Sequence, residues 1–186
     1  IEYILRGGHD AAAELIRTAY IESRGDETQA KRYSTEARPI IEHWQKIYAA
    51  ELVQPFEVER MYSYHDSDFA HLTIAGKIDV VEEVMSGEVR VTDWKTGSTK
   101  TAGEIDKADE EGRMSSYLRQ LAMYSYLIEG VSRGDTTVSE SRLVFLEAKP
   151  GEKNAIQSRK ITSVEIERLR QDIKDYDRSI KDGSWM

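Results

Sequence analysis

Apolar residues recur at intervals of three and four positions in four segments of the chain, which is the spacing of amphipathic helices. These segments cover residues 9–20, 35–52, 114–129 and 162–181. Thr162 and Glu165 form a capping-box pattern that predicts the start of the last helix. In the second segment, we expect Pro39 either in the first turn of the helix or at a break after a short preceding turn.

Apolar and polar residues alternate in other segments, with the period of two that is typical of β-strands. We expect strands over residues 56–64, 69–84, 89–95, 142–148 and 155–161. Ser86 and Gly87 would join the second and third strands into an antiparallel hairpin, and a PGEKN turn would join the last two. The charged segment 98–112 has no apolar period and is predicted to be a loop. The resulting order is α, α, β, β, β, α, β, β, α.

Length and composition favour a single domain over residues 1–186, with a core large enough to fold without disulfides or a structural metal. The absence of cysteine excludes disulfides, zinc thiolate sites and cysteine-ligated iron–sulfur clusters, and it fits a cytoplasmic protein. No segment has the pattern of a membrane span or a signal peptide, so we expect a soluble protein. Because the chain begins with Ile1 rather than Met, we expect it to be part of a longer protein.

The net charge of −8 argues against a protein that binds polyanions over its whole surface, because such binding depends on clustered Lys and Arg. It does not exclude an enzyme that holds a divalent metal with carboxylates and meets DNA in a local cleft. The charge that a substrate encounters is that of the cleft, and the bound ion contributes to it.

Two charged residues continue the apolar face of the strand that reads VRVTDWKTG. Val89 and Val91 alternate with polar residues, and Asp93 and Lys95 fall on the same face as these two valines. A carboxylate and an ammonium on a buried face cost several kcal/mol unless they form a pair, bind a metal or take part in chemistry. The ordinary alternative is an ion pair on a partly exposed edge strand.

Asp79 joins this pair in the predicted hairpin. Positions whose numbers sum to about 173 would face one another across the turn, which places Asp79 near Trp94 and beside both Asp93 and Lys95. Two carboxylates and a lysine would therefore meet at one end of the hairpin. Carboxylate oxygens suit Mg²⁺ or Mn²⁺, whose octahedral coordination is completed by water and substrate phosphate.

Three motifs in this order resemble the PD-(D/E)xK nuclease superfamily, and within it the RecB-like exonuclease branch. They are GKID at residues 76–79, DWKTG at 93–97 and QLAMY at 120–124, the last of which fits a QxxxY signature. The resemblance covers roughly residues 54–130. It implies an α/β fold with a restriction-endonuclease-like αβββαβ core, in which helices flank a mixed central sheet.

The resemblance also implies roles for individual residues. Asp79 and Asp93 would bind the metal, with the backbone carbonyl of Trp94 as a further ligand. Lys95 would position or help deprotonate the attacking water, and it would stabilise charge that builds on the phosphate. Gln120 and Tyr124, one helical turn apart, would line the active site and contact DNA or order the catalytic groups.

A further metal ligand is expected from an early helix, as in many RecB-like members. His9, in GGHDAAAEL, is the first candidate for this ligand. Glu14 on the same helix is an alternative, and Glu57 and Glu59 on the first predicted strand are others.

The function implied by the resemblance is metal-dependent hydrolysis of DNA by an exonuclease in recombination, repair or phage DNA processing. No phosphate-binding GxxxxGK[ST] motif occurs, so a helicase partner would be a separate domain or subunit. The iron–sulfur branch of the superfamily is disfavoured because its cysteines are absent. Two alternatives stay open: a catalytically silent nuclease-fold module that binds DNA or a helicase partner, and a small acidic interaction domain whose motif matches are accidental.

Overall fold

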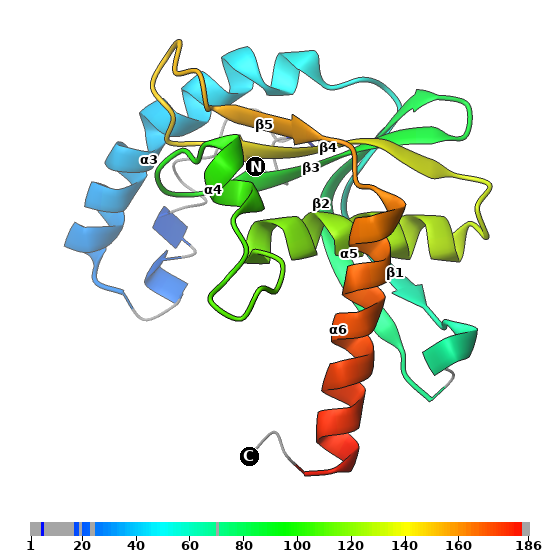
Figure 1. Cartoon of the computed structure of the whole chain (residues 1–186). Coiled ribbons are helices and arrows are strands. Elements are labelled where there is room, and N and C mark those ends of the chain that lie inside the picture. The colour runs from blue at the N-terminus through cyan, green and yellow to red at the C-terminus, as the bar shows by residue number, and fades with distance from the viewer. Residues whose placement is uncertain (1–4, 6–16, 19, 23–24, 70, 184–186) are drawn as a thin grey trace.

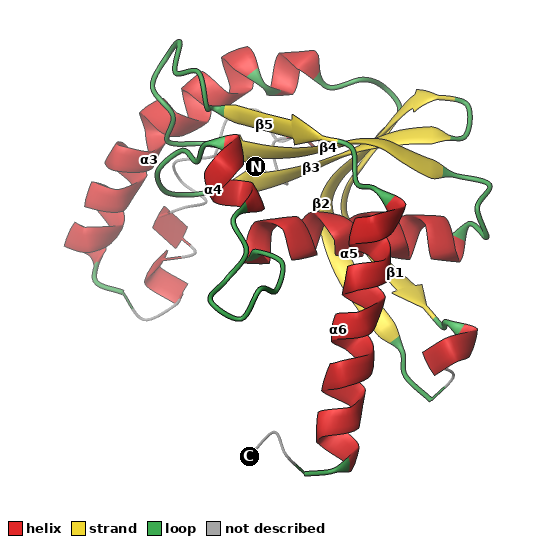
Figure 2. Ribbon diagram, in the orientation of Figure 1, coloured by secondary structure: helices red, strands yellow, loops and turns green. Residues whose placement is uncertain are grey.

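A mixed five-stranded sheet lies between helices in the computed structural model, which describes residues 5, 17–18, 20–22, 25–69 and 71–183 (Figures 1 and 2). The strands, in the spatial order β1-β2-β3-β4-β5, are β1 (Phe56–Tyr64), β2 (Ile74–Met85), β3 (Glu88–Lys95), β4 (Thr137–Phe145) and β5 (Ile156–Arg159). The helices are α3 (Glu27–Ile47), α4 (Ala102–Asp106), α5 (Ser116–Val131) and α6 (Ser163–Lys181), with short 3₁₀ turns η1 (Ala49–Glu51) and η2 (Ser67–Phe69). The predicted mixed sheet flanked by helices is confirmed.

The connections between the strands explain why the sheet is mixed. β1 pairs with β2, β2 with β3, and β4 with β5, each in antiparallel orientation. β3 and β4 pair in parallel, because the chain crosses between them through α5. A parallel pair requires such a crossover, whereas the antiparallel pairs need only turns. The parallel pairing places β3, with its charged residues, in the centre of the sheet.

Each face of the sheet is covered by a different helix. On one face, Leu121, Tyr124 and Leu127 of α5 pack on the main core of the sheet. On the other, Trp44 and Tyr48, at and just beyond the end of α3, pack against Val144 of β4. α6 packs on the outer side of α5 and then projects away from the sheet (Figure 1). In the described part of the chain, none of the helices combines the length and the apolarity needed to cross a membrane.

The second predicted helix begins eight residues earlier than expected. α3 starts at Glu27, because the side chain of Asp26 accepts a hydrogen bond from the backbone of Gln29 at 2.9 Å and so caps the helix. Pro39 lies inside α3 rather than in its first turn. The prediction was wrong because the first two turns of α3 are largely exposed and carry no continuous apolar stripe.

Other boundaries differ for reasons that lie in local contacts. Segment 98–112 contains α4, a short helix with a capping box at Thr101 and Glu104 and a buried Ile105, so the prediction of a plain loop was wrong. The second predicted strand starts at Ile74 instead of residue 69 because residues 67–69 form a 3₁₀ turn. β4 starts at Thr137, five residues early, because its parallel pairing with β3 begins there. Most of the first predicted helix lies outside the described residues.

Candidate active site

The candidate site lies where β2 and β3 separate. Their pairing runs from the hairpin turn to Val80 and Thr92 and then stops, while β3 continues beside β4 as far as Lys95. Beyond that point the backbone N–H of Trp94 donates to Oδ2 of Asp79 at 2.9 Å. The Asp79 carboxylate therefore takes the place of the β2 backbone as partner of β3, which brings it beside Asp93.

Donors from the protein surround the carboxylate of Asp93, which is only 2% exposed. Its Oδ1 accepts hydrogen bonds from Nε2 of Gln120 at 2.6 Å and from the hydroxyl of Tyr124 at 2.7 Å. Its Oδ2 pairs with Nζ of Lys95 at 2.7 Å. The buried carboxylate thus has one cation and two neutral donors as partners, which offset the cost of taking it out of water.

Gln120 connects the acidic and the basic groups of the site. Its Oε1 accepts from Nζ of Lys95 at 2.6 Å, while its Nε2 donates to Asp93 and to the hydroxyl oxygen of Tyr124, the latter at 2.7 Å. The ammonium of Lys95 also lies over the ring of Tyr117, 5.8 Å from the centroid. Because α5 carries Tyr117, Gln120 and Tyr124 at intervals of three and four residues, one face of this helix fixes the lysine and the aspartate together.

Burial and like charges shift the pKa values of two groups in the site. The pKa of Asp79 is raised to about 6, chiefly by burial and also by the charges of Asp93 and Glu59, while the Trp94 N–H and Lys95 act in the opposite direction. Burial and the charge of Asp93 raise the pKa of the Tyr124 hydroxyl above its ordinary value. Tyr124 is therefore a neutral hydrogen-bond donor, and Asp79 is a carboxylate in surroundings that favour a cation nearby.

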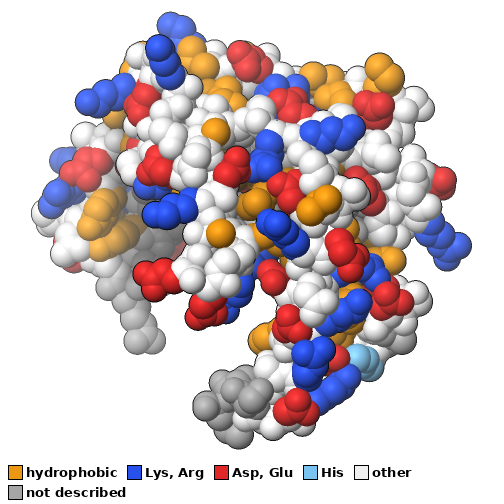
Figure 3. Space-filling model, in the orientation of Figure 1, with side chains coloured by type: hydrophobic (Ala, Val, Ile, Leu, Met, Phe, Trp, Pro, Cys, Tyr) orange, Lys and Arg blue, Asp and Glu red, His pale blue; other side chains and the backbone are white. Residues whose placement is uncertain are grey.

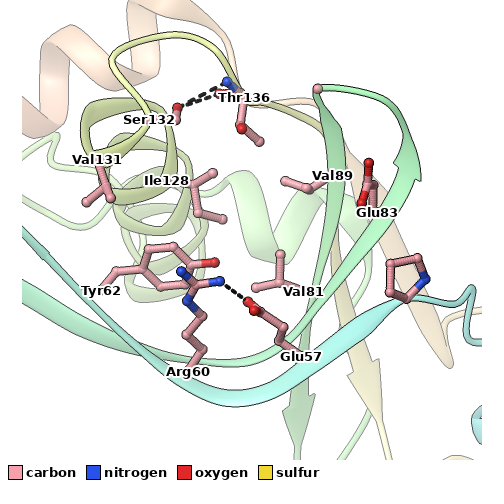
Figure 4. Close-up of a pocket in the computed structure, with 12 residues that line it drawn as sticks. Glu57, Arg60, Tyr62, Val81, Glu83, Val89, Ile128, Val131, Ser132 and Thr136 are labelled. Atoms are coloured by element: carbon pink, nitrogen blue, oxygen red, sulfur yellow. Dashed lines mark hydrogen bonds and ion pairs between the residues drawn. The ribbon is translucent and has the colours of Figure 1, made fainter.

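Of the two glutamates considered on β1, the structure brings Glu59 near the site and places Glu57 elsewhere. Glu59 lies opposite Asp79, forms an ion pair with Lys77 of β2 and adds its charge to the surroundings of Asp79. Glu57 pairs with Arg60 at the mouth of a separate pocket of about 360 Å³ between β1, β2 and the end of α5 (Figure 4). Glu57 is thus part of a different surface of the molecule.

The donor set fits a hard divalent cation. Asp79 and Asp93 supply carboxylate oxygens, which Mg²⁺ and Mn²⁺ prefer, and Mg²⁺ commonly binds through one or two carboxylates and retains several waters. Among the residues that the structure describes, no three acidic or histidine side chains converge closely enough to hold an ion by themselves. His9 and Glu14 lie outside the described residues. The candidate metal ligands among the described residues are therefore the two aspartates and the predicted backbone carbonyl of Trp94.

One basic residue beside the site escaped the sequence interpretation. Lys77 lies inside the GKID motif, two residues before Asp79, and its ammonium is held by Glu59. Its place inside the motif, two residues before Asp79, was a usable signal. The position of Glu59 could not be predicted, because it depends on a backbone conformation that glutamate rarely adopts.

Charged residues of both signs are mixed on the outer surface. On the face shown in Figure 3, blue Lys and Arg side chains alternate with red Asp and Glu side chains along α6 and do not gather into one basic patch. Several of them form ion pairs along or near that helix, including Arg178 with Asp175 and Lys181 with Asp177. This face of α6 is thus a mixed charged surface, without the clustered cations that bind nucleic acid.

Comparisons with known proteins agree with the fold and the family resemblance. Among solved structures, a "putative exonuclease" from Eubacterium rectale matches with a TM-score of 0.51 and 15% identity, covering 98% of this chain and 73% of that one. The structure of SSO0001 matches with a TM-score of 0.40 and 17% identity, covering 88% and 71% of the two chains, which is too distant to support an argument. No curated protein matches the chain.

The first of these structural matches supports the fold, since its identity is too low to transfer an activity. A match to a family model covers nearly the whole chain, from residue 6 to residue 186. This range includes the two aspartates, Lys95 and the helix that carries Gln120 and Tyr124. The chain belongs to the PD-(D/E)XK nuclease superfamily.

Proposed function

We propose that this protein is a Mg²⁺- or Mn²⁺-dependent deoxyribonuclease of the RecB-like branch, and that it degrades DNA as an exonuclease in recombination, repair or phage DNA processing. The observation that carries the proposal is the group formed by Asp79, Asp93 and Lys95 where β2 and β3 separate, with Gln120 bonded to both Asp93 and Lys95. Family membership and the exonuclease name of a structural neighbour support it.

The two aspartates and the Trp94 carbonyl would hold the metal. When bound there, the ion supplies Lewis-acid polarisation of the phosphate and lowers the pKa of a water molecule. The chain's own residues prepare the site for this. Tyr124 and Gln120 fix the direction of the Asp93 carboxylate, and the Trp94 N–H fixes that of Asp79.

Lys95 would act on the substrate and on the attacking water. Hydrolysis forms a bond between a water oxygen and phosphorus and breaks the bond from phosphorus to a sugar oxygen. The attacking water loses a proton, the leaving sugar oxygen gains one, and negative charge builds on the phosphate oxygens. An ammonium beside this phosphate stabilises that charge, and it also orients the water. Gln120 and the Tyr117 ring limit the positions that the Lys95 ammonium can take.

A cleavage assay with end-labelled DNA tests the proposal. Linear DNA labelled separately at each 5′ and 3′ end is incubated in Mg²⁺, in Mn²⁺ and in EDTA. The wild type is compared with Lys95→Ala and with Lys181→Ala, which removes an exposed lysine of α6 far along the sequence from the site. We expect metal-dependent degradation by the wild type and by Lys181→Ala, and a loss of most of the rate in Lys95→Ala.

The pattern of label release also separates the open possibilities. Early release of one end label would establish an exonuclease and its polarity, whereas internal fragments would show an endonuclease. Binding of DNA without cleavage in either metal would contradict the proposal and favour a catalytically silent module that binds DNA or a helicase partner. Equal cleavage rates for the wild type and Lys95→Ala would show that Lys95 has no catalytic role.

A further inference from the structure

Glu59 interrupts an otherwise continuous pairing of β1 with β2. From Phe56 opposite Glu82 to Tyr64 opposite Ile74, every position of the ladder is paired except Glu59 and Asp79, which lie opposite each other. Glu59 has a φ of 51°, in the left-handed region that residues with a side chain rarely adopt. The interruption therefore falls at the candidate catalytic aspartate.

The left-handed residue changes the side to which β1 presents its side chains. Glu57, Arg60 and Tyr62 all line the pocket in Figure 4, although an uninterrupted strand would place residues 57 and 60 on opposite faces. Glu59 does not line this pocket. Its carboxylate instead forms an ion pair with Lys77, two residues before Asp79 along β2, and its charge also acts on Asp79.

Stability does not account for this arrangement. Left-handed backbone at a residue with a side chain is strained, and such strain persists where the surrounding structure enforces it, often at functional sites. The Lys77 side chain is 53% exposed and that of Glu59 is 22% exposed, and ion pairs exposed to this degree contribute little to folding. The pair thus fixes a cation at a defined place without stabilising the fold enough to explain the strain.

The place of that cation suits a DNA backbone. The backbones of Lys77 and Asp79 are about 6.6 Å apart along β2. The Lys77 ammonium is held by Glu59, the residue whose charge acts on Asp79. The nearby cation of Lys95 is engaged with Asp93 and Gln120. A polyanion that approaches Asp79 and Asp93 meets two carboxylates, so a second ammonium at the border of the site would offset their repulsion.

We propose that Lys77 binds a backbone phosphate of the DNA adjacent to the phosphate at the Asp79 and Asp93 site, and that Glu59 is the positioning residue that holds the Lys77 ammonium there. This inference rests on the proposed function and deepens it, because it identifies how the substrate strand is placed. Lys77 acts as a point charge on phosphate and reads no base.

The salt dependence of DNA binding tests this contact directly. Each phosphate contact that is lost lowers the slope of log affinity against log salt concentration by about 0.9 for duplex and about 0.7 for single-stranded DNA. Binding of a labelled duplex and a labelled single strand is measured by fluorescence anisotropy in Mg²⁺, in the Lys95→Ala background so that the DNA is not degraded. The added substitutions are Lys77→Gln, Lys77→Arg and Lys181→Gln.

Lys181 is a matched control for Lys77. Its side chain is 57% exposed and pairs with Asp177, whose side chain is 15% exposed, so the two lysines have similar surroundings. We expect Lys77→Gln to lower the slope by the value for one phosphate, Lys77→Arg to retain it and Lys181→Gln to leave it unchanged. In otherwise wild-type protein, we expect Lys77→Gln to lower kcat/KM for cleavage about 5- to 20-fold.

Each result decides the inference separately from the proposed function. A slope for Lys77→Gln equal to that of the background would overturn the inference, and so would an equal loss in Lys181→Gln, which would reveal a general charge effect. If the wild type degrades DNA but Lys77→Gln has the same salt slope as the background, the nuclease proposal is supported and the phosphate contact is contradicted. If Lys77→Gln lowers the salt slope but neither the wild type nor any variant cleaves DNA in either metal, the phosphate contact is supported and the nuclease proposal is contradicted.

Discussion

The buried side chain of Asp93 is held in one orientation by contacts within the protein alone. Gln120 and Tyr124 donate hydrogen bonds to one of its oxygens, and Lys95 forms an ion pair with the other. These contacts fix the positions of the three partners as well as that of Asp93. In this state the Lys95 ammonium lies against Oδ2, an oxygen that a metal ion would also require. At the proposed metal site, the lysine would therefore compete with the ion for the Asp93 carboxylate.

This competition predicts that Lys95→Met binds metal more tightly than the wild type. Removal of the ammonium frees Oδ2 of Asp93 and removes a like charge from the neighbourhood of the cation. We expect the Kd for Mn²⁺, measured by calorimetry without DNA, to fall about 3- to 10-fold. Lys181→Met serves as the control, and weaker binding by Lys95→Met would show that the lysine supports the metal site instead.

Asp79 predicts an unusual dependence of stability on pH. Its pKa of about 6 in the folded protein is above the value of about 4 in an unfolded chain, so the folded state binds more protons between these values. The free energy of unfolding should therefore fall as the pH rises from about 4 through 6. Above pH 6 the ionised Asp79 should destabilise the fold by its full amount. Asp79→Asn keeps an acceptor for the Trp94 N–H and removes the destabilising charge.

We expect Asp79→Asn in EDTA to be more stable than the wild type at pH 8, by an amount on the order of 1–3 kcal/mol, and equally stable near pH 4. Urea unfolding at a series of pH values measures both. Glu57→Gln, which removes an exposed carboxylate of β1 away from the site, is the control variant. A variant that is less stable than the wild type at pH 8 would contradict the assigned role of burial and like charge at Asp79.

At the scale of the element, β1 carries a backbone conformation that a pair of substitutions can test. Glycine adopts positive φ without strain, whereas alanine does not, and both remove the Glu59 carboxylate. We expect Glu59→Gly to exceed Glu59→Ala in free energy of unfolding by about 1 kcal/mol or more. The same pair at Glu57, where φ is not positive, should show the opposite order. Equal stability of the two Glu59 variants would contradict a left-handed residue in this strand.

Arg170 links α6 to the segment between β1 and β2. This residue forms ion pairs with Asp66 and Asp68 in and beside η2, and Asp66, only 3% exposed, also accepts from the hydroxyl of Tyr126. Arg170→Leu would leave a buried carboxylate without its cation, so we expect a loss of about 2–4 kcal/mol. Arg168→Leu, at an exposed position of the same helix, should change stability by less than about 0.5 kcal/mol. Urea unfolding at pH 7 compares the two.

The sequence was sufficient to predict those elements that local signals determine. The alternation of residues 56–64 coincides with β1, and the capping box of Thr162 and Glu165 coincides with the start of α6. The approach of Asp79 to Asp93 and Trp94 could be anticipated because the hairpin at Gly87 limits the register of β2 and β3, which a bulge between Glu83 and Met85 shifts by only one residue.

Features that depend on distant partners could not be predicted. The first residues of β4 become a strand because they pair with β3, and Ser141 is fully buried although its neighbours give no apolar signal. Pro39 suggested a helix start, but α3 continues through it because Asp26 caps the helix much earlier. The ion pair of Glu59 with Lys77 depends on strain in one residue, and no local pattern indicates such strain.

For the whole molecule, an acidic chain is expected to gain stability from the cation that its proposed function requires. The net charge is −8, and Asp79 and Asp93 concentrate part of the negative charge in the candidate site. A ligand that binds only the folded state stabilises it by about 2.7 kcal/mol when its concentration is 100 times its Kd. For a chain of 186 residues this corresponds to a rise in Tm of about 5–10 °C.

We therefore expect Mg²⁺ or Mn²⁺ to raise the Tm of the wild type by this amount and EDTA to reverse the effect. Asp79→Asn should begin from a higher Tm without metal at pH 8 and show no further rise on titration, because the substitution removes both the repulsion and a ligand. NaCl at matched ionic strength separates specific binding from the screening of surface charges. Equal shifts in the wild type and in Asp79→Asn would place the stabilising ion elsewhere, since the two proteins differ only at the carboxylate where β2 leaves β3.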